Sequence, residues 1–126
     1  MPDTPLRIVV ADDSPHFRRS ICNILQREAN LSVVAEAEDG LAAVQAAEKH
    51  RPDLVLMDIS MPVMDGFDAT RIIKSKFPDA RILVLTMHDV ESISEAACKA
   101  GACCYLSKCC SKDELFKTFK DCLQVS

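Results

Sequence analysis

Short apolar runs alternate five times with amphipathic segments along this chain, and an alternation of this kind leaves few folds open. The runs are almost continuously hydrophobic, which is typical of strands buried on both faces of a sheet. We expect strands at Leu6 to Ala11, Ser32 to Ala37, Leu54 to Met57, Arg81 to Leu85 and Cys103 to Leu106. Strands that are separated by helices in this way predict a parallel sheet with helices on its faces.

Residues that begin and end helices stand between the predicted strands. Ser14 is an expected N-cap with Pro15 at the first helical position, and Gly101 is an expected stop after the fourth helix. Ser111 and Glu114 have the spacing of a capping box for the fifth helix. The second and third helices are expected to open at Gly40 and at Asp65-Gly66. Right-handed crossovers then favour an α/β fold of the flavodoxin-like, doubly wound type, with five parallel strands in the order 2-1-3-4-5 and five helices.

Composition narrows the class of protein further. The chain has 126 residues, of which 48% are hydrophobic and 27% charged, so we expect residues 1–126 to form one domain, with no output domain present. A net charge of −4 without a Lys/Arg cluster argues against direct binding of nucleic acid by this segment. No apolar run approaches the roughly 20 residues of a membrane span, and the N-terminus lacks the pattern of a signal peptide. We therefore expect no membrane partner and a cytoplasmic location.

Seven cysteines are an odd number, so they cannot all form internal disulfides. In a reducing cytosol we expect mostly thiols that pack as small apolar groups, including Cys22 and Cys122 on helices that share a sheet face. A metal site is disfavoured because no C-x-x-C occurs and neighbouring strand residues point to opposite faces. The clustered cysteines are Cys103, Cys104, Cys109 and Cys110, with Cys98 nearby. A lowered pKa at Cys109 or Cys110, beside Lys108, is a hypothesis for redox sensitivity.

Polar residues follow the predicted strands at one end of the sheet. Asp12 and Asp13 come after the first strand, Asp58 after the third, Thr86 after the fourth and Lys108 after the fifth. The carboxyl ends of parallel strands meet at one crevice, so these groups should converge there. Carboxylates that repel one another by about 4 kcal/mol per pair at 4 Å need a cation, and Mg²⁺ prefers oxygen ligands of this kind. Three histidines, His16, His50 and His88, show no ligand spacing with one another.

Four motifs together resemble the receiver domain of two-component response regulators, most closely the NarL/LuxR type. The motifs are Val10–Ser14 (VADDS), Leu56–Gly66 (LMDISMPVMDG), Leu85–Asp89 (LTMHD) and Tyr105–Lys108 (YLSK). The resemblance covers essentially the whole chain. It implies a phosphoprotein that receives a phosphoryl group from a sensor histidine kinase, self-associates on phosphorylation, and controls transcription through a C-terminal DNA-binding domain that is absent here.

The resemblance also implies a role for each residue of the crevice. Asp58 would be the phosphoacceptor, and Lys108 and Thr86 would contact the phosphoryl oxygens. The Mg²⁺ ligands would be Asp12, Asp13, Asp58 and the carbonyl of Ser60. Tyr105 would be the switch aromatic, whose rotamer follows Thr86. Such a protein is a switch and not an enzyme, since it catalyses only its own phosphotransfer and dephosphorylation.

Two alternatives stay open at this point. A Mg²⁺-dependent phosphohydrolase would also use Asp58 as nucleophile, but such enzymes often carry a carboxylic acid two residues later, where this chain has Ser60. A redox-responsive adaptor built on a pseudo-receiver would make use of the cysteines instead. The chain also departs from the family at Cys109, where a proline commonly follows the lysine. Without proline a trans bond is favoured by about 2.5 to 4 kcal/mol, so the loop after Lys108 is expected to be set differently.

Overall fold

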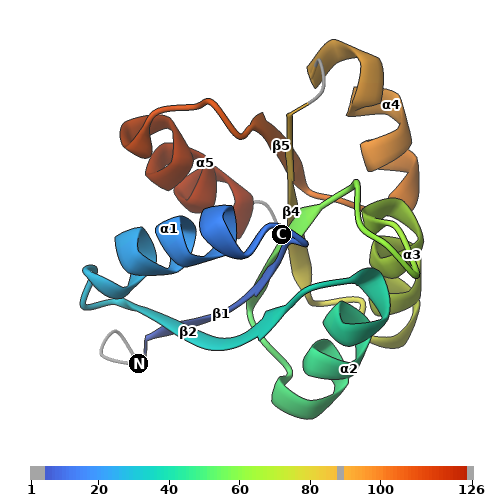
Figure 1. Cartoon of the computed structure of the whole chain (residues 1–126), viewed down its shortest axis with the longest axis horizontal. Coiled ribbons are helices and arrows are strands. Elements are labelled where there is room, and N and C mark those ends of the chain that lie inside the picture. The colour runs from blue at the N-terminus through green and yellow to red at the C-terminus, as the bar shows by residue number, and fades with distance from the viewer. Residues whose placement is uncertain (1–4, 88–89, 125–126) are drawn as a thin grey trace.

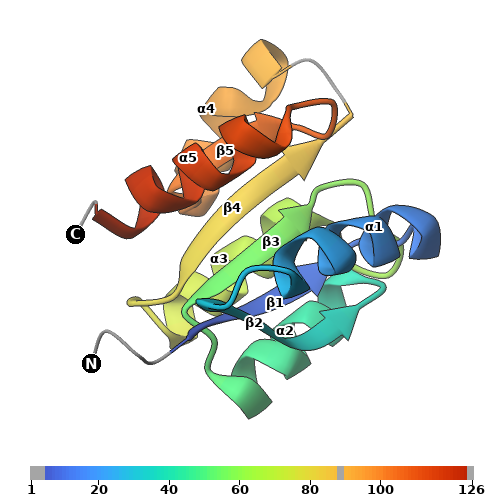
Figure 2. The same cartoon turned by 90° about the vertical axis from the view of Figure 1, so that its left-hand side faces the viewer.

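The computed structural model describes residues 5–87 and 90–124, and within them a single five-stranded parallel sheet carries all the helices (Figures 1 and 2). The strand order is β2-β1-β3-β4-β5, which confirms the predicted topology. The strands are β1 (Leu6–Ala11), β2 (Leu31–Ala37), β3 (Leu54–Asp58), β4 (Arg81–Thr86) and β5 (Cys104–Ser107). The helices are α1 (Pro15–Gln26), α2 (Gly40–His50), α3 (Gly66–Lys76), α4 (Val90–Ala100) and α5 (Lys112–Gln124). His88 and Asp89, the end of one predicted motif, lie outside the described residues.

The sheet separates two apolar cores. Helices α1 and α5 cover one face, and α2, α3 and α4 cover the other (Figure 1). Val10 on β1 packs with Ile21 of α1 and Phe119 of α5 in one core. Its neighbour Val9 packs with Val44 of α2 in the other core, because successive strand residues point to opposite faces. Strands buried on both faces explain the continuous apolar runs in the sequence.

Helix caps lie where the sequence predicts them. The Ser14 hydroxyl accepts a hydrogen bond from the Phe17 amide at 3.2 Å at the start of α1. Ser111 and Glu114 form the reciprocal capping box, in which the Glu114 amide donates to the Ser111 hydroxyl at 3.1 Å. Gly101 follows α4 with a φ of 105°, a left-handed conformation that favours glycine. None of the helices among the described residues is long and apolar enough to cross a membrane.

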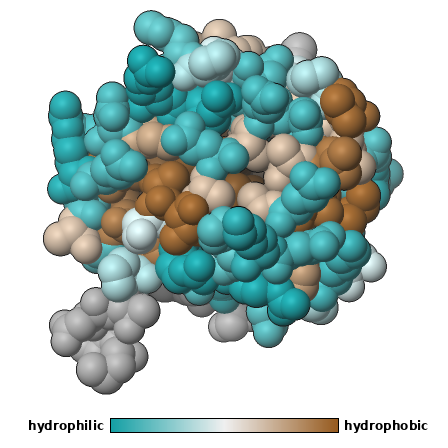
Figure 3. All heavy atoms as spheres, turned by 60° about the horizontal axis from the view of Figure 1, so that its bottom comes forward, coloured by the Kyte–Doolittle hydropathy of each residue, from teal (hydrophilic) through white to brown (hydrophobic). Residues whose placement is uncertain are grey.

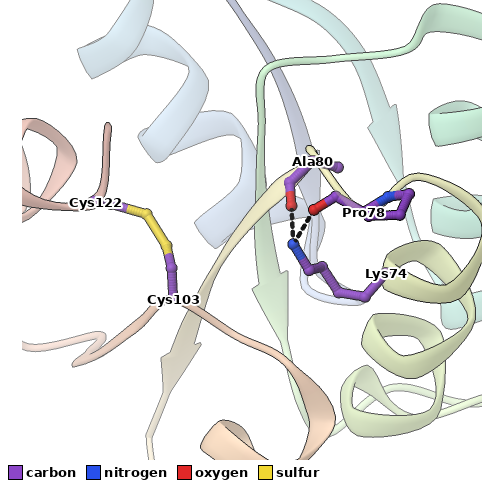
Figure 4. The surroundings of a disulfide bond; sticks show 5 residues. All are labelled: Lys74, Pro78, Ala80, Cys103 and Cys122. Atoms are coloured by element: carbon purple, nitrogen blue, oxygen red, sulfur yellow. Dashed lines mark hydrogen bonds between the residues drawn. A yellow bond between two sulfur atoms is a disulfide. The ribbon is translucent and has the colours of Figure 1, made fainter. Parts of the chain in front are cut away.

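The cysteine prediction is wrong for one pair. Cys103 and Cys122 form a disulfide with a Cα–Cα distance of 6.0 Å (Figure 4). Cys103 precedes β5, so the alternation of strand side chains does not govern it, and α5 runs back along β5 so that its last turn reaches the start of the strand. The remaining cysteines are free thiols, as expected: Cys22, Cys98, Cys104, Cys109 and Cys110.

Candidate functional site

Three carboxylates meet at the carboxyl ends of β1 and β3. One oxygen each from Asp12, Asp13 and Asp58 lies within 4.8 Å of the others. The strand register explains why Asp12 and Asp58 lie close together. Ala11 of β1 is the parallel partner of Met57 of β3, and an aspartate follows each of these two residues. Asp12 and Asp58 are 2% and 5% exposed, whereas Asp13 is exposed. The convergence of carboxylates predicted from the sequence is therefore present, with two of the three acids buried.

Lys108 reaches into this cluster from the loop after β5. Its Nζ lies 2.6 Å from Asp12 Oδ2 and 3.4 Å from Asp58 Oδ2, and its side chain is 8% exposed. The backbone amide of Lys108 donates to the Thr86 carbonyl at 2.8 Å, which fixes the loop against β4. The bond from Lys108 to Cys109 is trans, since no described residue has a cis peptide bond. The trans geometry expected without proline thus still lets the lysine reach both carboxylates.

The electrostatic environment of Asp58 raises the pKa of its carboxyl group. Burial is the largest cause, and the negative charge of Asp12 adds to it. Lys108 and the Ser60 amide, which donates to Asp58 Oδ1 at 3.3 Å, act in the opposite direction. The site thus carries an excess of buried negative charge that one ammonium group does not fully offset.

Asp12 is held more firmly than its neighbours. Its Oδ1 accepts from the Ser14 amide at 2.8 Å, and its Oδ2 is paired with Lys108. Its backbone carbonyl accepts from Arg18 Nη1 at 2.6 Å, and the Arg18 guanidinium in turn pairs with Glu36 at 3.0 Å. The start of α1 and the end of β2 therefore orient the first acid of the cluster.

A close approach of α3 holds the backbone of Asp58. A Cβ atom added at Gly66 would lie 2.2 Å from the Asp58 carbonyl oxygen, so only glycine fits there without a shift of the helix. The Gly66 amide donates to the Ile59 carbonyl at 3.0 Å. Between Ile59 and Gly66, Val63 adopts a φ of 68°, a strained conformation for a β-branched residue, and the residue is 77% exposed. The loop after Asp58 is thus pinned at both ends and strained at its tip.

The two residues expected to switch lie on adjacent strands. Thr86 is the last residue of β4 and is fully buried, and Ser107 is its partner on β5. Tyr105 is half-buried on the face covered by α4, where it packs against a small core that includes Ile59, Val84 and Ile93. Ile59 directly follows Asp58, so this core connects the acid cluster to Tyr105 and α4.

Two contacts of the site were not predicted from the sequence. The Lys108 ammonium lies 4.5 Å from the centroid of the Phe17 ring, which makes the first turn of α1 a platform for the lysine. Lys108 also lies closer to Asp12 than to Asp58. Phe17, three positions after the N-cap Ser14, could have indicated the contact with Lys108. Its position in the sequence is equally consistent with packing in the core under α1.

The thiol hypothesis for the same loop is wrong at Cys110. Burial, and then the charge of Glu114, raise the pKa of the Cys110 thiol instead of lowering it. The Lys108 ammonium is directed away toward Asp12 and Asp58. Cys109 is exposed, and the hypothesis of redox sensitivity stays a prediction there.

A separate hollow lies at the opposite end of the sheet, and its lining includes the charged residues Arg51, Asp53 and Lys76. It has a volume of about 500 Å³ and lies between the starts of β1 and β4. The Arg51 guanidinium covers the Phe77 ring in its lining at 4.3 Å. Figure 3 shows apolar groups exposed among hydrophilic side chains on the face that it brings forward from the bottom of Figure 1. The three clustered carboxylates and the ammonium of Lys108 lie at the other end of the sheet from this hollow.

Comparison with known proteins agrees with the geometry. The family model for the response regulator receiver domain matches residues 8–120. The regulatory protein DegU of Brevibacillus brevis is 42% identical over 94% of this chain and 50% of its own length. The regulator NarL of Mycobacterium tuberculosis H37Rv is 36% identical over 93% of this chain and 54% of its own length.

The relatives include an enzyme, and a solved structure matches nearly the whole chain. A protein-glutamate methylesterase of Myxococcus xanthus is 46% identical over 86% of this chain but only 31% of its own length. The signal receiver domain of NarL from Mycobacterium tuberculosis superimposes with a TM-score of 0.91 at 34% identity, covering 98% of this chain and 99% of that one. The chain spans about half the length of the transcriptional relatives it matches, and less of the methylesterase.

Proposed function

Since this chain belongs to the response regulator receiver family, we propose that Asp58 is its phosphoacceptor and that phosphorylation there switches the surface formed by α4, β5 and α5. One observation carries the proposal. A buried aspartate at the carboxyl end of the central strand β3 lies 3.4 Å from the ammonium of Lys108 and within 4.8 Å of two further acids. Phosphoryl transfer depends mainly on such positioning and charge neutralisation.

The donor set of the crevice fits Mg²⁺. The side chains of Asp12, Asp13 and Asp58 offer hard oxygen ligands, and the Ser60 carbonyl completes the proposed set. When bound, the ion neutralises negative charge on the transferring group and orients it. Three carboxylates and one ammonium leave a net charge of minus two when all are ionised, which is the charge that a divalent ion cancels.

Asp58 and Lys108 have separate roles in the proposed phosphoryl transfer. An Asp58 carboxylate oxygen attacks phosphorus, an O–P bond forms, and the bond from phosphorus to the leaving group breaks. With a sensor histidine kinase as donor the leaving group is the imidazole of a phosphohistidine. Lys108, steered by Asp12 and supported by the Phe17 ring, is placed to pair with the new phosphoryl oxygens.

The switch is proposed to pass through two neighbouring strands. The phosphoryl group adds about 1.5 to 2 negative charges and three acceptor oxygens, and the Thr86 hydroxyl and Lys108 move toward it. Tyr105 lies over the core that contains Ile59 and Ile93, so a shift of that core changes the position of Tyr105 and α4. The changed surface is the proposed output, either toward a DNA-binding domain or toward a second copy of the chain.

The phosphohydrolase alternative receives less support from the site. Ser60 is exposed at the position where a general acid would stand, and its amide donates to Asp58. A serine hydroxyl does not ionise near neutral pH, so it does not protonate a leaving group well. The alternative predicts steady turnover, which separates it from a switch that keeps its phosphoryl group.

A small phosphodonor tests the proposal directly. With Mg²⁺ and acetyl phosphate, the protein should gain one phosphoryl group on Asp58, detected by intact mass and peptide mapping. Asp58→Asn should gain none, whereas Asp79→Asn, an exposed aspartate at the other end of the sheet, should behave as the wild type. A folded wild-type sample that gains no phosphoryl group would overturn the phosphoacceptor role. Continuous release of phosphate from varied organic phosphates would favour the hydrolase.

A further inference from the structure

A second cluster of metal-ligating groups lies at the start of β5, at the other end of that strand from Lys108. One sulfur each from Cys103, Cys104 and Cys122 lies within 4.8 Å of the others. Two of the three are joined as the disulfide, and Cys104 is a free thiol beside it. The sequence places Cys104 near Cys109 and Cys110, but the fold replaces those partners with Cys122, which is far along the chain.

We propose that reduction of the Cys103–Cys122 disulfide opens a thiolate site in which Cys103, Cys104 and Cys122 bind a soft divalent metal ion of the Zn²⁺ type. Disulfide and metal are then alternative states of the same three residues. The proposal concerns the start of β5 and the end of α5, so it stands apart from the phosphoacceptor chemistry at Asp58.

The backbone already has the spacing that such a site needs. Zn–S bonds of about 2.3 Å in a tetrahedron place two sulfurs about 3.8 Å apart, so three sulfurs confined within 4.8 Å need only side-chain adjustment. The Cα atoms of Cys103 and Cys122 are 6.0 Å apart, and breaking the disulfide lets their sulfurs separate without moving the backbone far. Three protein ligands leave the fourth position open for water.

The three cysteines differ in burial, so the site has both buried ligands and a ligand that solvent reaches. Cys122 is fully buried on the inner side of α5, Cys104 is half-buried, and Cys103 is exposed. An ion can therefore reach the cluster from solvent past Cys103, and the inner two sulfurs then lie against the apolar core formed with α1. Thiolate ligands in such surroundings select soft ions over Mg²⁺, which keeps the site distinct from the acidic crevice.

The local charge favours a cation over bare thiolates. With the Cys103–Cys122 disulfide closed, burial, and then the charge of Asp121, raise the pKa of the Cys104 thiol. A dication that replaces the thiol protons compensates both effects, because it supplies positive charge where the thiolate alone is disfavoured. Three thiols release three protons to solvent as one ion binds, so binding should strengthen as the pH rises.

The redox step balances with an external dithiol or phosphine. A dithiol reductant transfers two electrons and two protons to the Cys103–Cys122 disulfide and becomes a disulfide itself. A phosphine supplies the two electrons instead and takes the oxygen of one water molecule to become a phosphine oxide, while the two protons of that water go to the sulfurs. The two resulting thiols and Cys104 then form the binding set. In the disulfide state Cys104 is the only thiol left in the cluster, so the oxidised chain should not hold the ion.

Metal titration of the reduced chain of residues 1–126 tests this proposal. The protein is reduced with a phosphine, kept free of oxygen, supplied with excess Mg²⁺ to fill the acidic crevice, and titrated with Co²⁺ and then Zn²⁺. We expect one Co²⁺ per chain with a thiolate-to-metal charge-transfer band, and displacement of that band by one equivalent of Zn²⁺. Ions bound by carboxylates produce no such band, so the two sites are distinguishable.

Matched cysteine variants locate the site. Cys103→Ser and Cys104→Ser should each weaken Zn²⁺ binding about tenfold or more, because loss even of a group that only supports a ligand costs that much. Cys98→Ser and Cys109→Ser, at exposed cysteines outside the cluster, should leave binding unchanged. Absence of the band in reduced, folded wild type overturns the proposal. A band that survives in Cys104→Ser, or that appears in the oxidised chain, overturns it equally.

Discussion

Opening the Cys103–Cys122 disulfide should lower the free energy of unfolding by about 3 kcal/mol, because the two cysteines close a loop across 19 positions of sequence. The loop contains β5, Lys108 and the capping box of α5. The disulfide limits the freedom of this whole segment in the unfolded chain. An unfolding slope of about 2 kcal/mol per molar urea then predicts a fall of about 1.5 M in the midpoint.

The measurement is urea unfolding of the oxidised wild type and of Cys103→Ser, with a chelator present so that no metal stabilises either chain. Cys103 is the better position for the substitution, since it is exposed, whereas a serine at Cys122 would bury a hydroxyl group in the core. Cys98→Ser, also at an exposed cysteine, is the matched control and should unfold as the wild type. Equal midpoints for the oxidised wild type and Cys103→Ser would refute the loop argument.

Three further predictions concern the acidic crevice. Burial raises the pKa of Asp58 above its ordinary value of 3.8. The folded protein is therefore stabilised by protonation of Asp58 below pH 3.8, and this stabilisation is lost as the pH rises through the pKa of the folded state. Asp58→Asn should therefore be more stable than wild type near neutral pH without Mg²⁺, and the difference should vanish near pH 4 in thermal melts. Lys108→Met leaves the carboxylates of Asp12 and Asp58 buried without the ammonium that pairs with them. Chemical denaturation at neutral pH should show that the free energy of unfolding falls by about 3 to 5 kcal/mol, and a fall below about 1 kcal/mol would contradict the pairing. Gly66→Ala forces α3 away from the Asp58 carbonyl, so it should lower the free energy of unfolding by about 1 to 3 kcal/mol and slow phosphorylation by acetyl phosphate. Ser75→Ala, at an exposed position of the same helix, should change neither quantity.

The sheet could be predicted because its signals are local. The apolar runs identify the strands, and caps such as Ser14 and Ser111 identify where helices begin. The convergence of Asp12 and Asp58 could also be predicted, since it follows from strand order alone. Strands β3 and β4 each end one residue later than expected, because Asp58 and Thr86 still pair within the sheet.

The rest could not be predicted because it depends on distances between side chains of separate elements. The preference of Lys108 for Asp12 depends on how the loop after β5 crosses the end of β4 and on the position of Phe17. The pairing of Cys103 with Cys122 depends on the length and direction of α5 against β5. Composition suggests reduced thiols but carries no information about which two sulfurs meet.

The division of the interior by the sheet has a consequence for how this sequence can change. Val9 and Val10 are adjacent in the chain, yet Val9 contacts the core under α2 and α3, and Val10 the core under α1 and α5. Effects of substitutions that share no partners add independently, whereas those within one core interact. A larger residue at Val9 should therefore be accommodated by changes in α2 or α3 and be unaffected by changes in α5. In the evolution of such a chain, covariation should follow the faces of the sheet and not adjacency along the strand.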